Sequence, residues 1–300
     1  MKTFRKLLFI LFFMGCPMSQ TLSSPLNTPP PDLLKLLATL GIQHDGTLVG
    51  INKIAQEKFL RKPGQERWEM EDIYEDKRSL ILPLLEKLVV IHAVFPSSRH
   101  YGTIIIHGAV VETMRQRLKF LDMLWAQGIR GDEIVFLTGE RPLDPTLENE
   151  EKLSNQELSA IPFKPGWCRK IPIPSTEADA ASLVWDQVIS HPDLQKKKVH
   201  FVRAPMKHNP MTGKPQRPST KDTVLAWIAT EPKVGKILAI SNNPYIPYQH
   251  QVMLNILEQE GVLKKGVTLE TVGPAANSDT LIAVHLDNLA RWIYAQVKES

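Results

Sequence analysis

Short apolar runs alternate with helix-spaced segments along the chain from about residue 102 onward. The apolar runs are continuous, which is typical of strands buried on both faces, and cover residues 102–109, 133–140, 198–205, 236–243 and 267–272. Amphipathic segments with helical spacing follow at residues 114–128, 176–190, 219–230, 248–261 and 278–297. This alternation predicts right-handed βαβ units, with the strands near Ile104, Ile134, Val199 and Ile237 as parallel neighbours in one sheet.

The residues before this alternation have a different pattern, which predicts helices. Asp32 is a candidate N-cap for an apolar segment that closes at Gly41, and residues 53–60 and 73–88 also have helical spacing. We therefore expect a helical N-terminal lead-in over residues 33–98 and an α/β domain over residues 99–300. The expected fold is a three-layer αβα, Rossmann-like parallel sheet. The first strand is not followed by the G-x-G-x-x-G fingerprint of dinucleotide-binding folds.

The first 24 residues have the layout of a secretory signal peptide or a lipoprotein signal. Lys2, Arg5 and Lys6 precede the apolar run LLFILFFMG, which is shorter than the roughly 20 residues of a membrane-spanning helix. Cys16 follows this run, and its lipidation would associate the protein with a membrane. A Pro-rich linker follows at residues 25–32. We expect an exported protein that is periplasmic or associated with the cell envelope.

Cysteine content and charge exclude several classes of protein. Cys16 and Cys168 are the only cysteines, so removal or acylation of Cys16 leaves no disulfide framework. The formal net charge is +4 and is not gathered into a basic patch interleaved with aromatic residues, which argues against nucleic-acid binding. We find no metal-ligand spacing such as H-E-x-x-H and no motif that identifies a cofactor.

Polar residues follow each predicted strand or begin the helix after it. The carboxyl ends of parallel strands line the ligand crevice in open α/β sheets, so these residues are candidates for one shared site. The predicted ligand-binding residues are His107, Arg117, Thr138, Gly139, Glu140, Arg141, Arg217, Thr220, Thr223, Ser241, Asn242, Asn243, Tyr245 and Gln249. The candidate general bases are Glu177 and Asp222.

Each of these residues also has a structural explanation, taken alone. Thr176 and Asp179 have the spacing of a capping box, and so do Ser219 and Asp222. The Asn243-Pro244 pair is a turn signal, and a histidine that ends an apolar strand is commonly a hydrogen-bonded core residue. The convergence of five polar segments on one edge favours a site.

The order of these segments resembles the YdcF/SanA/ElyC-like family of Rossmann-like bacterial proteins. The similar elements are the strand end IIIHG, Arg117 on the next helix, LTGE after the second strand, the pair Glu177-Ala178, and the helix start TKDT at residues 220–223. The resemblance covers about residues 100–260. Tyr245 and Gln249 stand where the family has histidine and arginine, and Glu140 replaces its second glycine. The resemblance implies a role in cell-envelope integrity.

The residues leave three functions open. In the first, Arg117, Arg141 and Arg217 clamp a small anionic ligand, phosphorylated or lipid-linked, that the protein hydrolyses or transfers. In the second, the same crevice binds a ligand or maintains the envelope without chemistry. In the third, the chain is a secreted factor that acts on other proteins through the lead-in. Neither the substrate nor the oligomeric state follows from the sequence.

Overall fold

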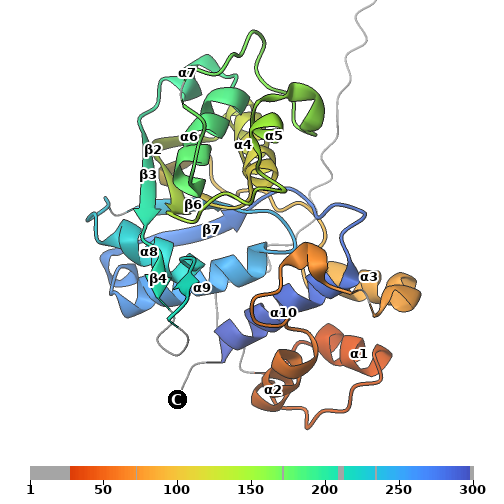
Figure 1. Cartoon of the computed structure of the whole chain (residues 1–300). Helices are drawn as coiled ribbons and strands as arrows, with labels where there is room; N and C mark the ends of the chain where they lie inside the picture. Colours follow the sequence, from red (N-terminus) through yellow and green to blue (C-terminus); the bar gives the residue numbers. More distant parts are fainter. Residues whose placement is uncertain (1–27, 72, 171, 209–212, 234, 298–300) are drawn as a thin grey trace, which may run out of the picture.

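A computed structural model describes residues 28–71, 73–170, 172–208, 213–233 and 235–297 (Figure 1). The predicted signal and Cys16 lie outside the described residues. Among the helices that are described, none is both long and apolar enough to cross a membrane.

The centre of the fold is a five-stranded parallel sheet in the order β3-β2-β1-β6-β7. Ile104 of β1 pairs with Ile134 on one side and with Leu238 on the other. The predicted parallel arrangement of the four strands is confirmed, and the final apolar run forms a fifth parallel strand, β7, at the edge beside β6. The strands are β1 (His100–His107), β2 (Arg130–Gly139), β3 (Val199–Ala204), β6 (Lys236–Ile240) and β7 (Thr268–Val272).

Helices cover both faces of the sheet, because successive residues of a strand point to opposite sides. Ile104 and Ile106 share one core with α4 (Val111–Ala126) and α6 (Glu177–Val188). Ile105 shares another with α8 (Thr220–Ile228) and α9 (Ile246–Gln259) on the other face (Figure 1). The predicted three-layer, Rossmann-like α/β fold is confirmed.

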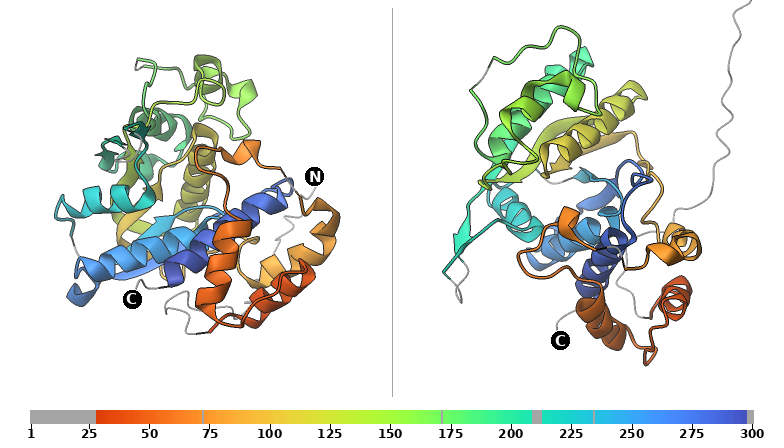
Figure 2. Two further views of the ribbon diagram at one scale, coloured as in Figure 1. Left: turned by 60° about the horizontal axis from the view of Figure 1, so that its bottom comes forward. Right: turned by 45° about the vertical axis from the view of Figure 1, so that its right-hand side comes forward.

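The lead-in forms a third core with the last helix of the chain. Side chains of α1 (Pro31–Thr39), α2 (Leu48–Lys58) and α3 (Arg78–Lys87) pack with Ile282, Leu289 and Ile293 of α10 (Ile282–Gln296). Figure 2 shows the lead-in beside α10 in both views. Because α10 also packs against α9, this helix joins the lead-in to the α/β part of the chain.

The ends of the lead-in helices differ in part from the prediction. Pro30 is the N-cap of α1 and Asp32 lies inside its first turn, so the prediction of an Asp32 cap was wrong. A proline at the first helical position needs no backbone N–H there, which explains the earlier start. Gly41 does follow the helix, with a positive φ of 73° that glycine adopts without strain.

Shorter elements complete the described chain. They are η1 (Arg67–Glu69), η2 (Glu75–Lys77), α5 (Glu150–Ser154), η3 (Gln156–Leu158), α7 (Pro192–Gln195), β4 (Lys207–His208), β5 (Pro215–Gln216) and η4 (Leu263–Lys265).

Candidate functional site

A cavity of about 1010 Å³ lies at the carboxyl ends of β1 and β2 and the amino ends of α6 and α8. This is the edge at which ligands bind in open α/β sheets. Nine of the predicted site residues line it: His107, Arg117, Arg141, Glu177, Arg217, Thr220, Thr223, Tyr245 and Gln249. The lining described in the structure does not include Thr138, Gly139, Glu140, Asp222, Ser241, Asn242 or Asn243.

The lead-in and α10 supply a wall of the cavity that sequence reasoning missed. The loop at residues 61–68 lines the cavity with Arg61, Lys62, Glu66 and Arg67, and Arg291 of α10 lines it as well. The local signal in the sequence is a Pro-Gly loop among cations, RKPGQER, which by itself predicts a solvated turn. Its position over the strand ends depends on the packing of the lead-in against α10.

Arg117 holds the ends of two central strands together. Its Nη1 donates to the carbonyl oxygens of His107 (2.6 Å), the last residue of β1, and of Gly108 (2.9 Å), which follows it. Its Nε and Nη2 donate to Oδ1 of Asn242, after β6, at 2.9 and 2.7 Å. Burial is the main cause that lowers the pKa of Arg117 to about 10. Most N–H groups of the Arg117 guanidinium therefore donate hydrogen bonds within the protein, although Arg117 lines the cavity.

The Ser-Asn-Asn segment after β6 is buried beneath the cavity. Its side chains bond beyond the local backbone, because Ser241 donates to Oε1 of Gln249 (2.5 Å) and Asn243 donates to the carbonyl oxygen of His92 (2.6 Å). Together with the bond from Arg117 to Asn242, these contacts tie the strand end to α4, α9 and the lead-in. The segment shapes the floor through Arg117 and Gln249, which do line the cavity.

Glu177 is a buried carboxyl at the first position of α6. Its Oε2 accepts a hydrogen bond from the Gly139 amide at 3.1 Å, and Nη2 of Arg141 is 3.9 Å from its Oε1. A Cβ at Gly108 would lie 2.8 Å from Oε1, so the carboxyl rests directly against the end of β1. Burial raises the pKa of Glu177, although Arg141 opposes this shift. A carboxyl with a raised pKa that lines a cavity is suited to proton transfer.

Arg141 is mostly neutralised by an acid that the sequence did not single out. Its Nη1 and Nη2 donate to the two oxygens of Glu148 at 2.8 and 3.2 Å. Glu148 is buried and also accepts from the amides of Val111 and Asp144. This planar pair fixes the guanidinium beside Glu177 and reduces the charge that Arg141 presents to the cavity.

Three predicted residues at the same sheet edge bond elsewhere. The Thr138 hydroxyl donates to the carbonyl oxygen of Val202 at 2.6 Å, and Glu140 pairs with Arg203 of β3. Asp222 forms the capping box of α8 with Ser219 and lies 2.7 Å from the ammonium of Lys207. The structural explanation considered for Asp222 therefore describes its contacts, and Glu177 is the candidate acid or base that reaches the cavity.

His107 is a buried, neutral imidazole at the end of β1. Burial, with Arg117 nearby, lowers its pKa from 6.5 to about 3. The unfolded chain thus takes up a proton here below about pH 6.5, whereas the folded chain does so only near pH 3. The stability that His107 contributes is complete above pH 6.5 and decreases as the pH falls towards 3.

The variant His107→Gln is expected to be less sensitive to acid than the wild type. Between pH 7 and pH 5 the wild type should lose about 2 kcal/mol more of its free energy of unfolding than the variant, because only the wild type gains this proton on unfolding. Urea unfolding at a series of pH values measures the difference. His285, whose pKa burial lowers to about 4, is present in both proteins and cancels. Equal losses in the two proteins would contradict the prediction.

Comparison with known proteins adds no further constraint. No family model, curated protein or solved structure matches the chain. In the part of the chain that the structure describes, no three histidine, cysteine, aspartate or glutamate residues are grouped so that they could hold a metal ion. Cys168 is an exposed free thiol. The assignment of the fold therefore rests on the sheet, and the proposal of a function rests on the cavity.

Proposed function

We propose that this protein binds a small anionic ligand, a phosphorylated molecule, in the cavity at the strand ends. The observation that carries the proposal is the excess of cations in the described lining, which has seven cations and three acids. The excess remains positive when the pairing of Arg141 with Glu148 and of Arg291 with Asp287 is included. The cations are Arg61, Lys62, Arg67, Arg117, Arg141, Arg217 and Arg291, and the acids are Glu66, Glu177 and Asp279. Arginine suits phosphate because its planar donors match phosphate oxygens. A volume of about 1010 Å³ accommodates a ligand of metabolite size.

A second candidate function, hydrolysis or transfer of a phosphoryl-linked group, is favoured by Glu177. The raised pKa of its carboxyl suits it to give a proton to a leaving oxygen or to accept one from an attacking hydroxyl. Non-catalytic binding in the same cavity is the alternative, and turnover decides between them.

The finer assignments from the sequence belong to the proposal. Membership in the YdcF/SanA/ElyC-like family is supported by the order of motifs over residues 100–260 and by the Rossmann-like sheet. Export to the cell envelope is supported by Lys2, Arg5, Lys6 and the apolar run that follows them. N-terminal sequencing of the protein from fractionated cells tests export, and an intact Met1 in the cytoplasmic fraction would exclude it.

A panel of phosphorylated metabolites tests the binding function. Isothermal titration calorimetry should detect at least one phosphorylated compound that binds, while the dephosphorylated form of the same compound should not, because the cationic lining recognises the phosphate. Each binder is then incubated with wild type and with Glu177→Gln. Turnover that disappears in the variant supports the catalytic function, and binding without turnover supports the alternative. A panel in which no phosphorylated compound binds would refute the proposed function.

A further inference from the structure

Four guanidinium groups gather where the lead-in closes the cavity: Arg61, Arg67, Arg217 and Arg291. Two carboxylates accompany them. Glu66 lies 3.3 Å from Arg217 and 3.7 Å from Arg61, and Asp287 lies 3.0 Å from Arg291. Four positive charges against two negative charges leave this cluster with an excess of +2.

Two buried donors in this cluster make no hydrogen bond among the residues described, Nη1 of Arg61 and Nε of Arg67. The nearest charged partner of Arg61 Nη1 is Oε2 of Glu66, which at 3.7 Å is within ion-pair distance but too far for a hydrogen bond. Burial lowers the pKa of Arg61, and the neighbouring Arg67 and Arg291 lower it further. A buried donor without an acceptor, held among like charges, is costly. An oxyanion placed here would satisfy both donors and the excess charge together.

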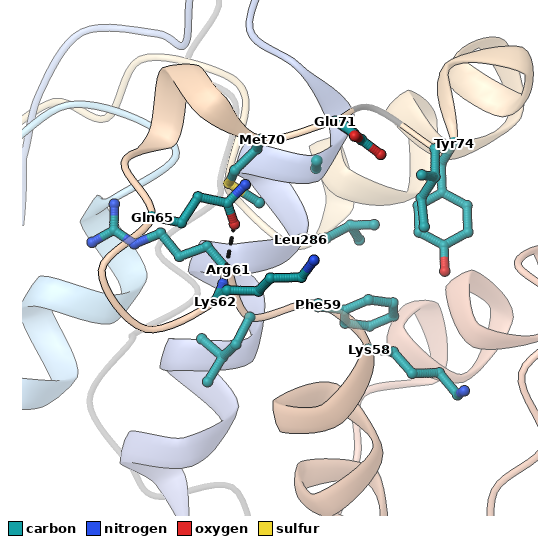
Figure 3. A pocket seen from close by; sticks show the side chains of 12 residues that line it. Lys58, Phe59, Arg61, Lys62, Gln65, Met70, Glu71, Tyr74 and Leu286 are labelled. Carbon is teal, nitrogen blue, oxygen red and sulfur yellow. Dashed lines mark hydrogen bonds between the residues drawn. The ribbon is translucent and has the colours of Figure 1, made fainter.

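Tyr245 and Asp287 help to position the two arginines. The Arg67 guanidinium lies over the ring of Tyr245, with Cζ 4.4 Å from the ring centroid, and Tyr245 is the N-cap of α9. Arg61 is held through its backbone amide, which donates to Asp287 at 3.2 Å. Arg61 lines both the cavity and a small neighbouring pocket, and Figure 3 shows its guanidinium directed away from Phe59 and Tyr74 on the other side of that pocket. Tyr245 therefore positions the Arg67 guanidinium, and Asp287 positions the backbone from which the Arg61 side chain extends.

We infer that Arg61 and Arg67 form a subsite for a divalent oxyanion, so that the ligand carries a phosphate monoester dianion held by the lead-in. This inference rests on the proposed function and makes it more specific. A dianion matches the excess of two charges in the cluster, and its three terminal oxygens can accept the hydrogen bonds that Nη1 of Arg61 and Nε of Arg67 do not make within the protein. A phosphodiester carries one charge and two free oxygens, so it matches the cluster less well. The ligand then spans from the lead-in to the strand ends near Glu177.

The test compares two ligands that differ by one methyl group. Phenyl phosphate is a dianion at pH 8, whereas methyl phenyl phosphate is a monoanion. We expect wild-type protein to bind phenyl phosphate at least about tenfold more tightly than the diester in isothermal titration calorimetry at pH 8. Arg61→Gln and Arg67→Gln should each weaken binding of phenyl phosphate by about tenfold or more, which is the loss of one charge-assisted hydrogen bond.

Arg99→Gln is the matched control. Arg99 is exposed and directly precedes β1, at the opposite end of the sheet from the cavity, so this variant should bind as the wild type does. Thermal melts of all variants establish that they are folded. Arg67 lies in η1, which contributes no buried residue, so we expect Arg67→Gln to remain folded. This variant therefore tests the subsite even if Arg61→Gln is unstable.

The outcomes separate the inference from the proposed function. Wild-type affinity for phenyl phosphate in Arg67→Gln would overturn the subsite. Equal affinity of the wild type for monoester and diester would overturn its preference for a dianion. The proposed function survives both results, and it fails only when no phosphorylated compound of the wider panel binds.

Discussion

Arg117→Met is expected to lower the free energy of unfolding by about 3 kcal/mol, because two buried acceptors and one partly buried acceptor lose their donor at once. These acceptors are the carbonyl oxygens of His107 and Gly108 and Oδ1 of Asn242. Methionine fills much of the space but donates no hydrogen bond. The variant no longer buries a positive charge, which offsets part of the lost stability. The carbonyl groups at the end of β1 nevertheless lose their hydrogen-bond donor.

Urea unfolding of the wild type and Arg117→Met measures this difference. Arg99→Met is the control, because it makes the same chemical change at an exposed position at the other end of the sheet and should alter stability by less than about 0.5 kcal/mol. A loss below about 1 kcal/mol in Arg117→Met would show that water or other donors replace the guanidinium.

Gly108→Ala is expected to destabilise the fold by about 3 kcal/mol and to abolish ligand binding, because the new methyl group has no space. Its Cβ would lie 2.7 Å from the carbonyl oxygen of Leu137 and 2.8 Å from Oε1 of Glu177. That oxygen belongs to the backbone of β2 and accepts a hydrogen bond from the Gly108 amide. It therefore cannot rotate away from the new methyl group. The strand end or the carboxyl must therefore shift, and either movement changes the cavity.

The matched control lies in β1, the strand that Gly108 directly follows. At Gly102 an added Cβ would meet its nearest atom, the carbonyl oxygen of Lys236, at 3.7 Å, which is an ordinary contact. Gly102→Ala should therefore keep the stability within about 0.5 kcal/mol of the wild type and leave phenyl phosphate binding unchanged. Urea unfolding measures the stability of both variants, and isothermal titration calorimetry measures their binding of phenyl phosphate. Wild-type behaviour of Gly108→Ala in both measurements would mean that the carboxyl is not held against this position.

The sheet could be predicted from the sequence because its signal is local. Strands that are buried on both faces need continuous apolar runs, so Ile104, Ile105 and Ile106 could be assigned to a strand without knowing their partners. The parallel order of neighbours then placed the polar strand ends at one edge. His107, Arg117 and Glu177 were found in this way, and all three line the cavity.

The rest of the site depends on contacts between distant residues. Arg117 and Asn242 are 125 positions apart, and no pattern in either segment shows that one donates to the other. The lead-in arginines were even harder to predict, because Arg61 and Arg67 reach the cavity only through the packing of the lead-in on α10. For Asp222 the local signal was correct, since its capping-box spacing described its contacts. Local chemistry thus predicted the caps of α6 and α8 and the strand ends, but not the cap of α1 or the lead-in wall.

The position of β3 at the edge of the sheet bears on self-association. An edge strand presents unpaired backbone groups to which a strand of another molecule can add, and charged side chains on the strand oppose this. β3 is short and carries Arg203, which is exposed and pairs with both Glu140 and Asp179. An incoming strand would have to pack against this ion-pair network and displace water from it. The same arginine that contributes nothing to the cavity lining therefore makes edge-to-edge growth of the sheet unfavourable.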